Sequence, residues 1–185
     1  YLLFGDPLTD AIYPIDTVTQ IVAMTYNINS NDWANHADSV LAVIQRNPAD
    51  IFAFQEARAT QKTFMNQNLG ENFHYPEYVP GQRGLVRNPI YFNTERFTLI
   101  DSGYTLVDTC NYSRFVTWVQ LLDHQTDREF FVYNNNACNQ NDSAGTAIRN
   151  LHAAILAETI HGHQTDSATA DLPAIVLGEF PYDSD

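Results

Sequence analysis

Two polar residues at the end of an apolar stretch are the first candidates for chemistry in this sequence. Gln55 and Glu56 follow Asp50 and the apolar residues 51–54, a run typical of a strand buried on both faces. Open α/β sheets tend to bind ligands outside the carboxyl ends of their strands, and a carboxylate there suits a hard cation. Glu56 is therefore a candidate metal ligand, although the pair taken alone is explained more simply by a solvated carboxylate that caps the next helix.

A second strand is expected to bring another polar residue next to Glu56. Residues 19–27, TQIVAMTYN, form this strand and end in Asn27. Residues 31–46 predict a helix between the two strands, because apolar side chains recur there at helical spacing and Asn47-Pro48 follows as a stop. The strands of a strand-helix-strand unit are commonly neighbours in one sheet. We therefore expect their ends to bring Asn27 and Glu56 together.

The rest of the chain predicts a domain of mixed secondary structure. Further helices are expected at residues 60–69 and 144–160, the second of them capped by Ser143. Short strands are expected at residues 73–79, 89–93, 97–101, 115–122, 130–135 and 172–177. This order predicts an α/β fold, a layered α/β sandwich in which the fourth and fifth of these strands form a hairpin. We assign residues 19–185 to one domain and residues 1–18, which show no sustained period, to an N-terminal arm.

The composition limits the partners that the chain can bind. The formal net charge is −13, and Lys62 is the only lysine among 9 basic residues. Gripping a long polyanion through several phosphates needs clustered Lys and Arg, which this sequence does not have. We therefore do not expect extended nucleic acid as a partner, whereas a small phosphorylated substrate is compatible with the charge. No apolar run is long enough to cross a bilayer.

The two cysteines bear on the compartment in which the protein works. Cys110 and Cys138 flank the expected hairpin at its two open ends, so a disulfide between them is geometrically possible. We expect this disulfide to form. It would place the protein in an oxidising environment, which makes it extracytoplasmic or secreted.

Other candidate residues are explained better by packing or by solvent exposure. His161 and His163 have the spacing of a two-ligand metal clip, but they fall in a polar loop that is expected after the third helix. Tyr75, Tyr78 and Tyr91 are expected to pack in the core rather than to form a binding platform. The remaining histidines lack any partner spacing and are expected in surface or packing positions: His36, His74, His124 and His152.

Six segments match a known family in the family's own order. They read TYNI at residues 25–28, FQE at 54–56, NPIYFNTERFTLIDSG at 88–103, SRFVTW at 113–118, FFVYNNNA at 130–137 and AIVLGEF at 174–180. In these segments the chain resembles the endonuclease/exonuclease/phosphatase superfamily, the metal-dependent phosphodiesterases with the fold of pancreatic deoxyribonuclease. The resemblance implies that fold for most of the chain.

The resemblance also implies a metal-dependent site at the strand ends. Asn27 matches the asparagine that positions the catalytic site, and Glu56 matches the principal Mg²⁺ ligand. Glu179 keeps a carboxylate where the family has an aspartate, so the implied metal ligands are Glu56 and Glu179. Arg114 lies where close relatives carry an arginine, which could clamp a phosphate or form a sheet-edge ion pair. Together with Asn136, the implied catalytic residues are Asn27, Arg114, Asn136 and Glu179, and the implied cofactor is Mg²⁺.

Three departures from the family pattern lower the expected activity. Residues 134–137 read NNNA where the family reads Asn-Thr-His-Leu, so Asn136 replaces a histidine and cannot carry a positive charge. Residues 178–181 read GEFP where the family reads Gly-Asp-Phe-Asn, so the carboxylate has a longer stem and Pro181 removes an amide and a backbone N–H. The family's general base belongs to an Asp-His pair on a later loop, and the sequence reaches Asp185 before such a pair.

These departures leave two main hypotheses about function. Each lost group typically costs on the order of a hundredfold in rate or more, so we expect a catalytically inactive, phosphodiesterase-like domain with a binding or structural role in an assembly. A protein partner is then expected to cover the second sheet, which would be incomplete in a chain that ends at Asp185. The alternative is an active Mg²⁺-dependent phosphodiesterase or phosphatase whose Asp-His end lies beyond Asp185. A third hypothesis is a cleaved fragment of such an enzyme.

Overall fold

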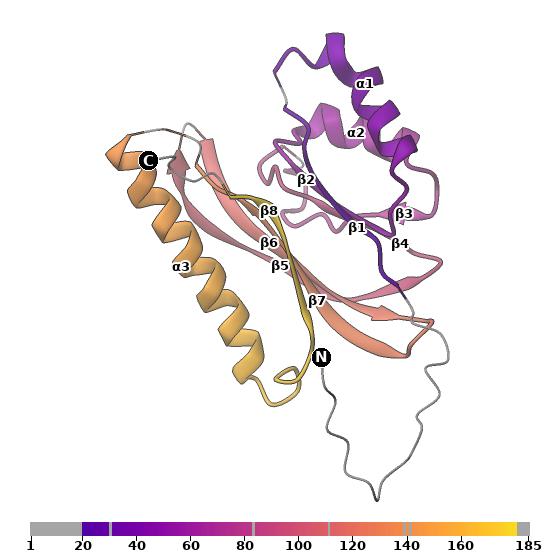
Figure 1. The fold of residues 1–185 in the computed structure, drawn as a ribbon, viewed down its shortest axis with the longest axis vertical. Coiled ribbons are helices and arrows are strands. Elements are labelled where there is room, and N and C mark those ends of the chain that lie inside the picture. The colour runs from indigo at the N-terminus through magenta and orange to yellow at the C-terminus, as the bar shows by residue number, and fades with distance from the viewer. Residues whose placement is uncertain are drawn as a thin grey trace, which may run out of the picture.

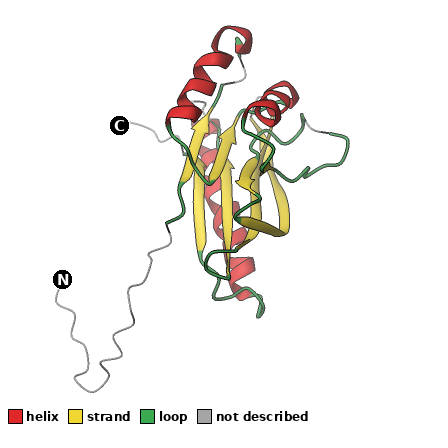
Figure 2. Ribbon diagram, turned by 90° about the vertical axis from the view of Figure 1, so that its right-hand side faces the viewer, coloured by secondary structure: helices red, strands yellow, loops and turns green. Residues whose placement is uncertain are grey.

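The computed structural model of the chain describes residues 20–180, apart from residues 30, 83, 111, 139 and 141. The expected arm of residues 1–18 lies outside the described residues, and so do Pro181 and Asp185. The described residues form two β-sheets with helices on their outer faces (Figures 1 and 2).

The first sheet has four strands in the order β1-β2-β4-β3. β1 (Ala23–Asn27) and β2 (Ile51–Gln55) are parallel, while β4 (Ile90–Asn93) and β3 (Phe73–His74) continue the sheet in antiparallel fashion. All residues of β2 are buried. The prediction of a strand covered on both faces, with β1 as its neighbour, is confirmed.

Helices α1 (Trp33–Arg46) and α2 (Ala59–Asn68) cover one face of the first sheet (Figure 1). α1 begins after the N-cap residue Asp32 and turns its buried residues Val40 and Ile44 toward the sheet. Their core cluster also contains Phe52, Phe54, Tyr75 and Tyr91. Tyr75 and Tyr91 therefore pack in the core, as predicted.

The second sheet has the order β5-β6-β7-β8. β5 (Phe97–Cys110), β6 (Tyr112–Asp123) and β7 (Arg128–Asn136) are antiparallel, and β8 (Ala174–Glu179) runs parallel to β7. Helix α3 (Ser143–Thr165) lies along the outer face of this sheet (Figure 1). β5 and β8 are the edge strands, and the expectation that a partner covers this sheet stays a prediction.

Alternating side chains hold the layers together. In β7, Phe130 and Val132 point into a cluster shared with Ile51 of the first sheet, while Phe131 and Tyr133 point into a cluster under α3. This alternation follows from the two-residue period of a strand. The predicted layered α/β sandwich is thereby confirmed.

Several strands differ in length from the prediction, and β5 and β3 differ most. β5 continues to Cys110 instead of ending at Asp101, and two register shifts against β6 interrupt its side-chain alternation. Such bulges hide a long strand from a reading based on period two. β3 ends at His74 instead of Val79, because Pro76 cannot donate a hydrogen bond to the ladder.

Helix α3 is longer than predicted at its C-terminal end. It ends at Thr165 instead of residue 160, and it begins after Asp142, whose Oδ1 accepts a hydrogen bond from the backbone N–H of Gly145 (2.7 Å). Asp142, and not Ser143, is therefore the N-cap. An acceptor side chain at this position satisfies one of the free N–H groups of the first turn.

The extension of α3 corrects the placement of its two late histidines. His161 and His163 lie in the helix and not in a loop. The ring of His163 stacks on Phe131, with 4.4 Å between centroids, and its Nδ1 lies 2.7 Å from the hydroxyl of Tyr133. Burial lowers the pKa of His163. This packing against the sheet explains why the helix continues past residue 160.

A disulfide joins Cys110 at the end of β5 to Cys138 just after β7, as predicted from their positions beside the hairpin. The structure has no helix among its described residues that is long and apolar enough for a membrane span.

Candidate active site

The carboxyl ends of parallel strands from both sheets meet at one end of the molecule. In the first sheet Asn27 is opposite Gln55, the residue before Glu56. In the second sheet Asn136 is opposite Glu179. β1 and β8 also contact each other. The predicted site residues from distant parts of the sequence are therefore brought to the same place.

Asn27 links the two carboxylates that were predicted as metal ligands. Its Nδ2 donates to Oε2 of Glu179 at 2.7 Å and lies 3.5 Å from Oε1 of Glu56. Its Oδ1 accepts from the backbone N–H of Asn29 at 2.9 Å, which fixes the orientation of the amide. One amide nitrogen thus holds both carboxylates side by side, and the predicted proximity of Asn27 and Glu56 is confirmed.

The backbone at Glu56 is in an unusual conformation. Its φ is +60°, in the left-handed region that non-glycine residues rarely adopt. Backbone hydrogen bonds fix the chain on both sides, from Ile28 N–H to Gln55 O and from Ala57 N–H to Arg87 O. A conformation of this kind costs on the order of 1–3 kcal/mol and is concentrated at functional sites. The surroundings therefore hold this carboxylate in place at the end of β2.

Gly178 positions the second carboxylate. Its φ is +136°, and a Cβ atom there would lie 2.3 Å from the backbone oxygen of Asn135. Only glycine allows this close approach of β8 to β7. The next residue, Glu179, then receives a hydrogen bond from Asn135 Nδ2 to its backbone oxygen (3.2 Å).

The carboxylate of Glu179 is partly buried and lies near charges of both signs. Burial raises its pKa, and the negative charge of Glu56 acts in the same direction. The hydrogen bond from Asn27 and the positive charge of Arg114 oppose this change. Two like charges held this close favour the binding of a cation between them.

The two carboxylates suit a magnesium ion better than a metal that takes all its ligands from the protein. Glu56 and Glu179 supply carboxylate oxygens, which hard cations prefer. No group of three or more His, Cys, Asp or Glu side chains that could hold a metal ion occurs among the described residues. Mg²⁺ is usually bound by one or two carboxylates and completes its shell with water and substrate phosphate. Glu56 and Glu179 therefore match the number and type of protein ligands that Mg²⁺ usually has.

Arg114 is a buried arginine and does not form a sheet-edge ion pair. It lies on the inner strand β6, is 2% exposed, and donates to Oδ1 of Asn136 (2.5 Å) and to the backbone oxygen of Ala137 (3.0 Å). Its Nε also lies 3.5 Å from the backbone oxygen of Cys110. The expected sheet-edge ion pair is wrong, because β6 is an inner strand and these partners are uncharged oxygens. The expected phosphate contact stays a prediction.

The contact with Arg114 fixes the orientation of Asn136. Because Oδ1 faces the guanidinium, Nδ2 points the other way and lies 3.5 Å from the hydroxyl of Tyr112. Nδ2 is thus the donor end of the Asn136 side chain, which is buried. The structure brings it together with Arg114, and Arg114 in turn affects the charge of Glu179.

Arg87 and Tyr112 belong to this region but were not predicted from the sequence. The Cζ atoms of Arg87 and Arg114 lie 4.0 and 4.1 Å from the ring centroid of Tyr112. Arg87 directly precedes the NPIYFN segment, but no periodicity or spacing marks it. Its backbone pairing with Ala57 next to Glu56, which brings it here, is visible only in three dimensions.

Buried amides tie the two sheets together beside the site. Gln55 Nε2 donates to Asn134 Oδ1 (2.8 Å), and Asn134 Nδ2 donates to Phe54 O (2.9 Å). Asn88 Nδ2 donates to the backbone oxygen of Asn134 (2.8 Å). All three amide side chains are buried. Because unsatisfied buried amides are costly, this network fixes β2 against β7.

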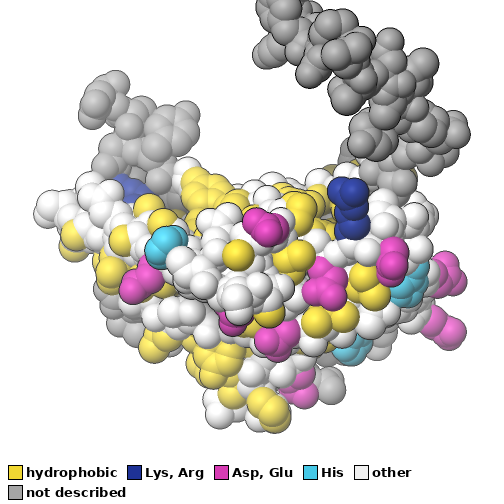
Figure 3. All heavy atoms as spheres, turned by 90° about the horizontal axis from the view of Figure 1, so that it is seen from below, with side chains coloured by type: hydrophobic (Ala, Val, Ile, Leu, Met, Phe, Trp, Pro, Cys, Tyr) yellow, Lys and Arg dark blue, Asp and Glu magenta, His cyan; other side chains and the backbone are white. Residues whose placement is uncertain are grey.

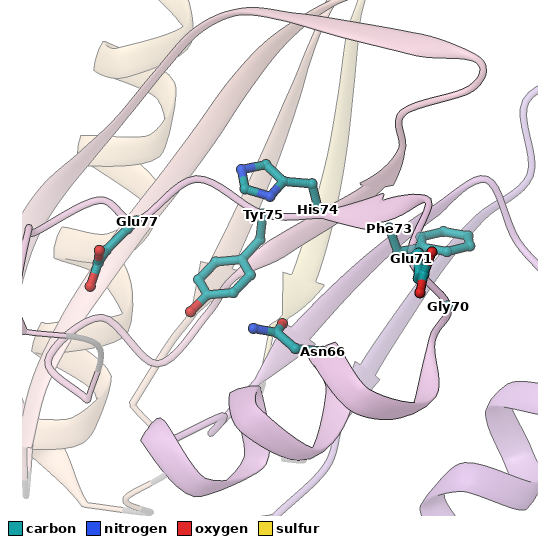
Figure 4. A pocket seen from close by; sticks show the side chains of 7 residues that line it. All are labelled: Asn66, Gly70, Glu71, Phe73, His74, Tyr75 and Glu77. Atoms are coloured by element: carbon teal, nitrogen blue, oxygen red, sulfur yellow. The ribbon is translucent and has the colours of Figure 1, made fainter.

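A pocket of about 410 Å³ lies elsewhere, between the end of α2 and β3. Its acidic residues Glu71 and Glu77 lie at opposite ends of it (Figure 4). No pair of carboxylates therefore converges there, and we place the candidate active site at the strand ends.

On the face seen from below in Figure 3, the described residues show no cluster of basic side chains. Figure 3 shows acidic side chains scattered over this face and only isolated Lys or Arg groups. This distribution agrees with the net charge of −13.

Comparison with known proteins places this fold among phosphate-ester hydrolases. The sequence profile of the Endonuclease/Exonuclease/phosphatase family matches residues 24–178. No curated protein matches the chain.

Three similar solved structures illustrate the range of the fold. A mannosyl-6-phosphatase of Bacteroides thetaiotaomicron has a TM-score of 0.74 and 20% identity over 89% of this chain and 67% of its own length. D. rerio TDP2, complexed with a single-strand DNA product, has a TM-score of 0.71 and 11% identity over 89% and 62%. The human Nocturnin catalytic domain, with bound sulfate, has a TM-score of 0.68 and 17% identity over 88% and 65%. The chain thus spans about two thirds of the length of these structures, and identities this low show the fold alone.

Proposed function

The chain belongs to the endonuclease/exonuclease/phosphatase family, and from this premise we propose that it hydrolyses a phosphate ester beside a divalent cation held by Glu56 and Glu179. The observation that carries the proposal is the amide of Asn27, which holds both carboxylates at the meeting point of the two sheets.

Each residue of the site has a role in this chemistry. Mg²⁺, when bound, would polarise a phosphate oxygen. Asn27 keeps the two carboxylates in position, and Asn136 offers its Nδ2 as a donor to a phosphate oxygen. In hydrolysis a water oxygen bonds to phosphorus, the ester P–O bond breaks, and the leaving oxygen takes up a proton. In the family an Asp-His pair takes the proton from the water, and we assign no described residue of this chain to that step.

The charge of the chain favours a small substrate. With a net charge of −13 and only 9 basic residues, the chain would repel a long polyanion over most of its surface. A small phosphate ester contacts only the residues of the site and is therefore less affected by the negative charge of the rest of the surface.

A second candidate function is binding without turnover. It is favoured by Asn136, which occupies the family's histidine position and is buried against Arg114. In that case the domain would bind metal and phosphate in an assembly, with a protein partner on the second sheet. For either function we propose an extracytoplasmic location, since a disulfide persists in oxidising compartments.

The test compares the wild type with Glu56→Gln and Glu179→Gln, with Glu158→Gln on the exposed face of α3 as the matched control. The measurements are Mn²⁺ binding by electron paramagnetic resonance and Mg²⁺-dependent hydrolysis of p-nitrophenyl phosphate. Loss of a residue that only supports a metal ligand typically weakens metal binding by about tenfold to a hundredfold. Because Glu56 and Glu179 are assigned as direct ligands, we expect each site variant to weaken Mn²⁺ binding by at least this much. We also expect each site variant to abolish hydrolysis.

The outcomes separate the two candidates. Mn²⁺ binding by wild type with no hydrolysis in the full native polypeptide would support binding without turnover. If Glu56→Gln binds Mn²⁺ as tightly as wild type, the assigned metal site is wrong and both candidates fail.

A further inference from the structure

One aromatic ring beside the carboxylates is contacted by two arginines. The guanidinium groups of Arg87 and Arg114 both lie close to the ring of Tyr112, with Cζ to centroid distances of 4.0 and 4.1 Å. Cation–π contacts of this kind hold a guanidinium in place while leaving its N–H donors unused. The question is which of the two can reach a ligand.

The two arginines differ in their hydrogen bonds and exposure. Arg114 is 2% exposed and donates to Asn136 and Ala137. Arg87 is only half-buried. Within the described part of the chain, its guanidinium makes no hydrogen bond or ion pair, and its contact is the ring of Tyr112. Arg87 therefore keeps its guanidinium donors available, whereas Arg114 uses its Nε and Nη1 donors within the protein.

The position of Arg87 places those donors at the candidate active site. Its backbone oxygen accepts from the N–H of Ala57, the residue after Glu56. The hydroxyl of Tyr112, on which its guanidinium rests, lies 3.5 Å from Nδ2 of Asn136. Arg87 is thus linked on one side to the metal-ligand candidate and on the other to the candidate phosphate donor.

The charges around Arg87 leave it available to an anion. Burial lowers its pKa, and the neighbouring positive charges of Arg58 and Arg114 lower it further. The charge of Glu56 and the group at Tyr112 act in the opposite direction. Three arginines near one another in a chain with 9 basic residues form a local positive region, which an anionic group would stabilise.

We propose that Arg87, stacked on Tyr112, binds the anionic phosphate group of the substrate and supplies the positive charge that Asn136 cannot carry. The inference rests on the proposed function and makes the substrate class more specific. A phosphate monoester carries a second negative charge and more free oxygens than a diester. A guanidinium fork beside a divalent cation therefore favours the monoester.

The experiment measures binding of two probes to the full chain in the presence of Mg²⁺ by isothermal titration calorimetry. The probes are inorganic phosphate, which resembles the monoester end, and dimethyl phosphate, which resembles a diester. The variants are Arg87→Gln and Arg87→Lys. The matched control is Arg46→Gln, which removes an exposed arginine at the end of α1.

We expect wild type to bind inorganic phosphate more tightly than dimethyl phosphate. Arg87→Gln should weaken inorganic phosphate binding by about tenfold to a hundredfold, the usual effect of losing hydrogen bonds to a charged group. Arg87→Lys should recover part of the loss, because it keeps the charge without the fork. Arg46→Gln should bind like wild type.

Three results would overturn the inference: no phosphate binding by wild type, unchanged affinity in Arg87→Gln, or an equal loss in Arg46→Gln. If Arg87→Gln does not fold, the comparison of Arg87→Lys with wild type decides. Phosphate binding that depends on Arg87 without any hydrolysis would remove the proposed enzymatic function but keep the inference. If hydrolysis depends on Glu56 but Arg87→Gln binds inorganic phosphate as tightly as wild type, the proposed function is kept and the inference fails.

Discussion

Reduction of the disulfide should destabilise the protein by an amount that follows from its place in the chain. Cys110 and Cys138 are separated by 28 positions and join the end of β5 to the segment after β7. In the chain-entropy model, a loop of this length contributes about 3–4 kcal/mol to the free energy of unfolding. Opening it also loosens two backbone oxygens that Arg114 contacts, those of Cys110 and Ala137.

The assay is urea denaturation followed by tryptophan fluorescence, with and without a phosphine reductant. The reduced protein should unfold at lower urea, with a loss of about 3–4 kcal/mol and an m-value no smaller than that of the oxidised protein. The double variant Cys110→Ser and Cys138→Ser should match the reduced wild type and should not respond to the reductant. This variant serves as the control for effects of the reductant itself.

A loss below about 1 kcal/mol would refute the reasoning, because it would mean that the hairpin already restricts the unfolded loop or that strand pairing alone holds the two ends. A smaller m-value would show instead that reduction alters the compactness of the unfolded state.

Two further predictions concern single side chains. Burial lowers the pKa of Lys62 to about 8, below its unfolded value, so the unfolded state binds more protons between about pH 8 and 10.5 and stability should rise with pH there. The free energy of unfolding of wild type minus that of Lys62→Met should therefore grow by up to about 1.4 kcal/mol per pH unit in urea titrations, and a constant difference would contradict this. Gly178→Ala should cost more than about 2 kcal/mol, because its Cβ meets the backbone of Asn135. Gly162→Ala in α3, where an added Cβ has nothing within 4 Å, should instead stabilise the protein by up to about 1 kcal/mol. Both glycine variants are measured by thermal unfolding.

The layered fold could be predicted because its main signals are local. The apolar run before Gln55 and the helical spacing before Asn47 gave two strands and a helix whose chain order fixes them as neighbours. The full length of β5 could not be predicted, since its register shifts break the alternation. The late turns of α3 were missed because His163 is polar in sequence but packs on Phe131.

The candidate site was predictable where a residue ends a strand. Asn27 and Glu56 follow apolar segments, and parallel strands bring their ends to one edge. Glu179 was predicted only through the family resemblance. The role of Arg114 could not be predicted, because its exposure depends on the two strands that flank β6. Arg87 was missed for a related reason, since only tertiary pairing places it on Tyr112.

The buried amides between the sheets have a mechanical consequence for the site. One carboxylate stands on the first sheet and the other on the second, so any sliding of one sheet over the other would change their separation. Such sliding would break the hydrogen bonds of Gln55, Asn88 and Asn134 in a place that water does not reach. The network therefore fixes the two sheets relative to each other, so the distance between the two carboxylates is set by the fold before a ligand binds.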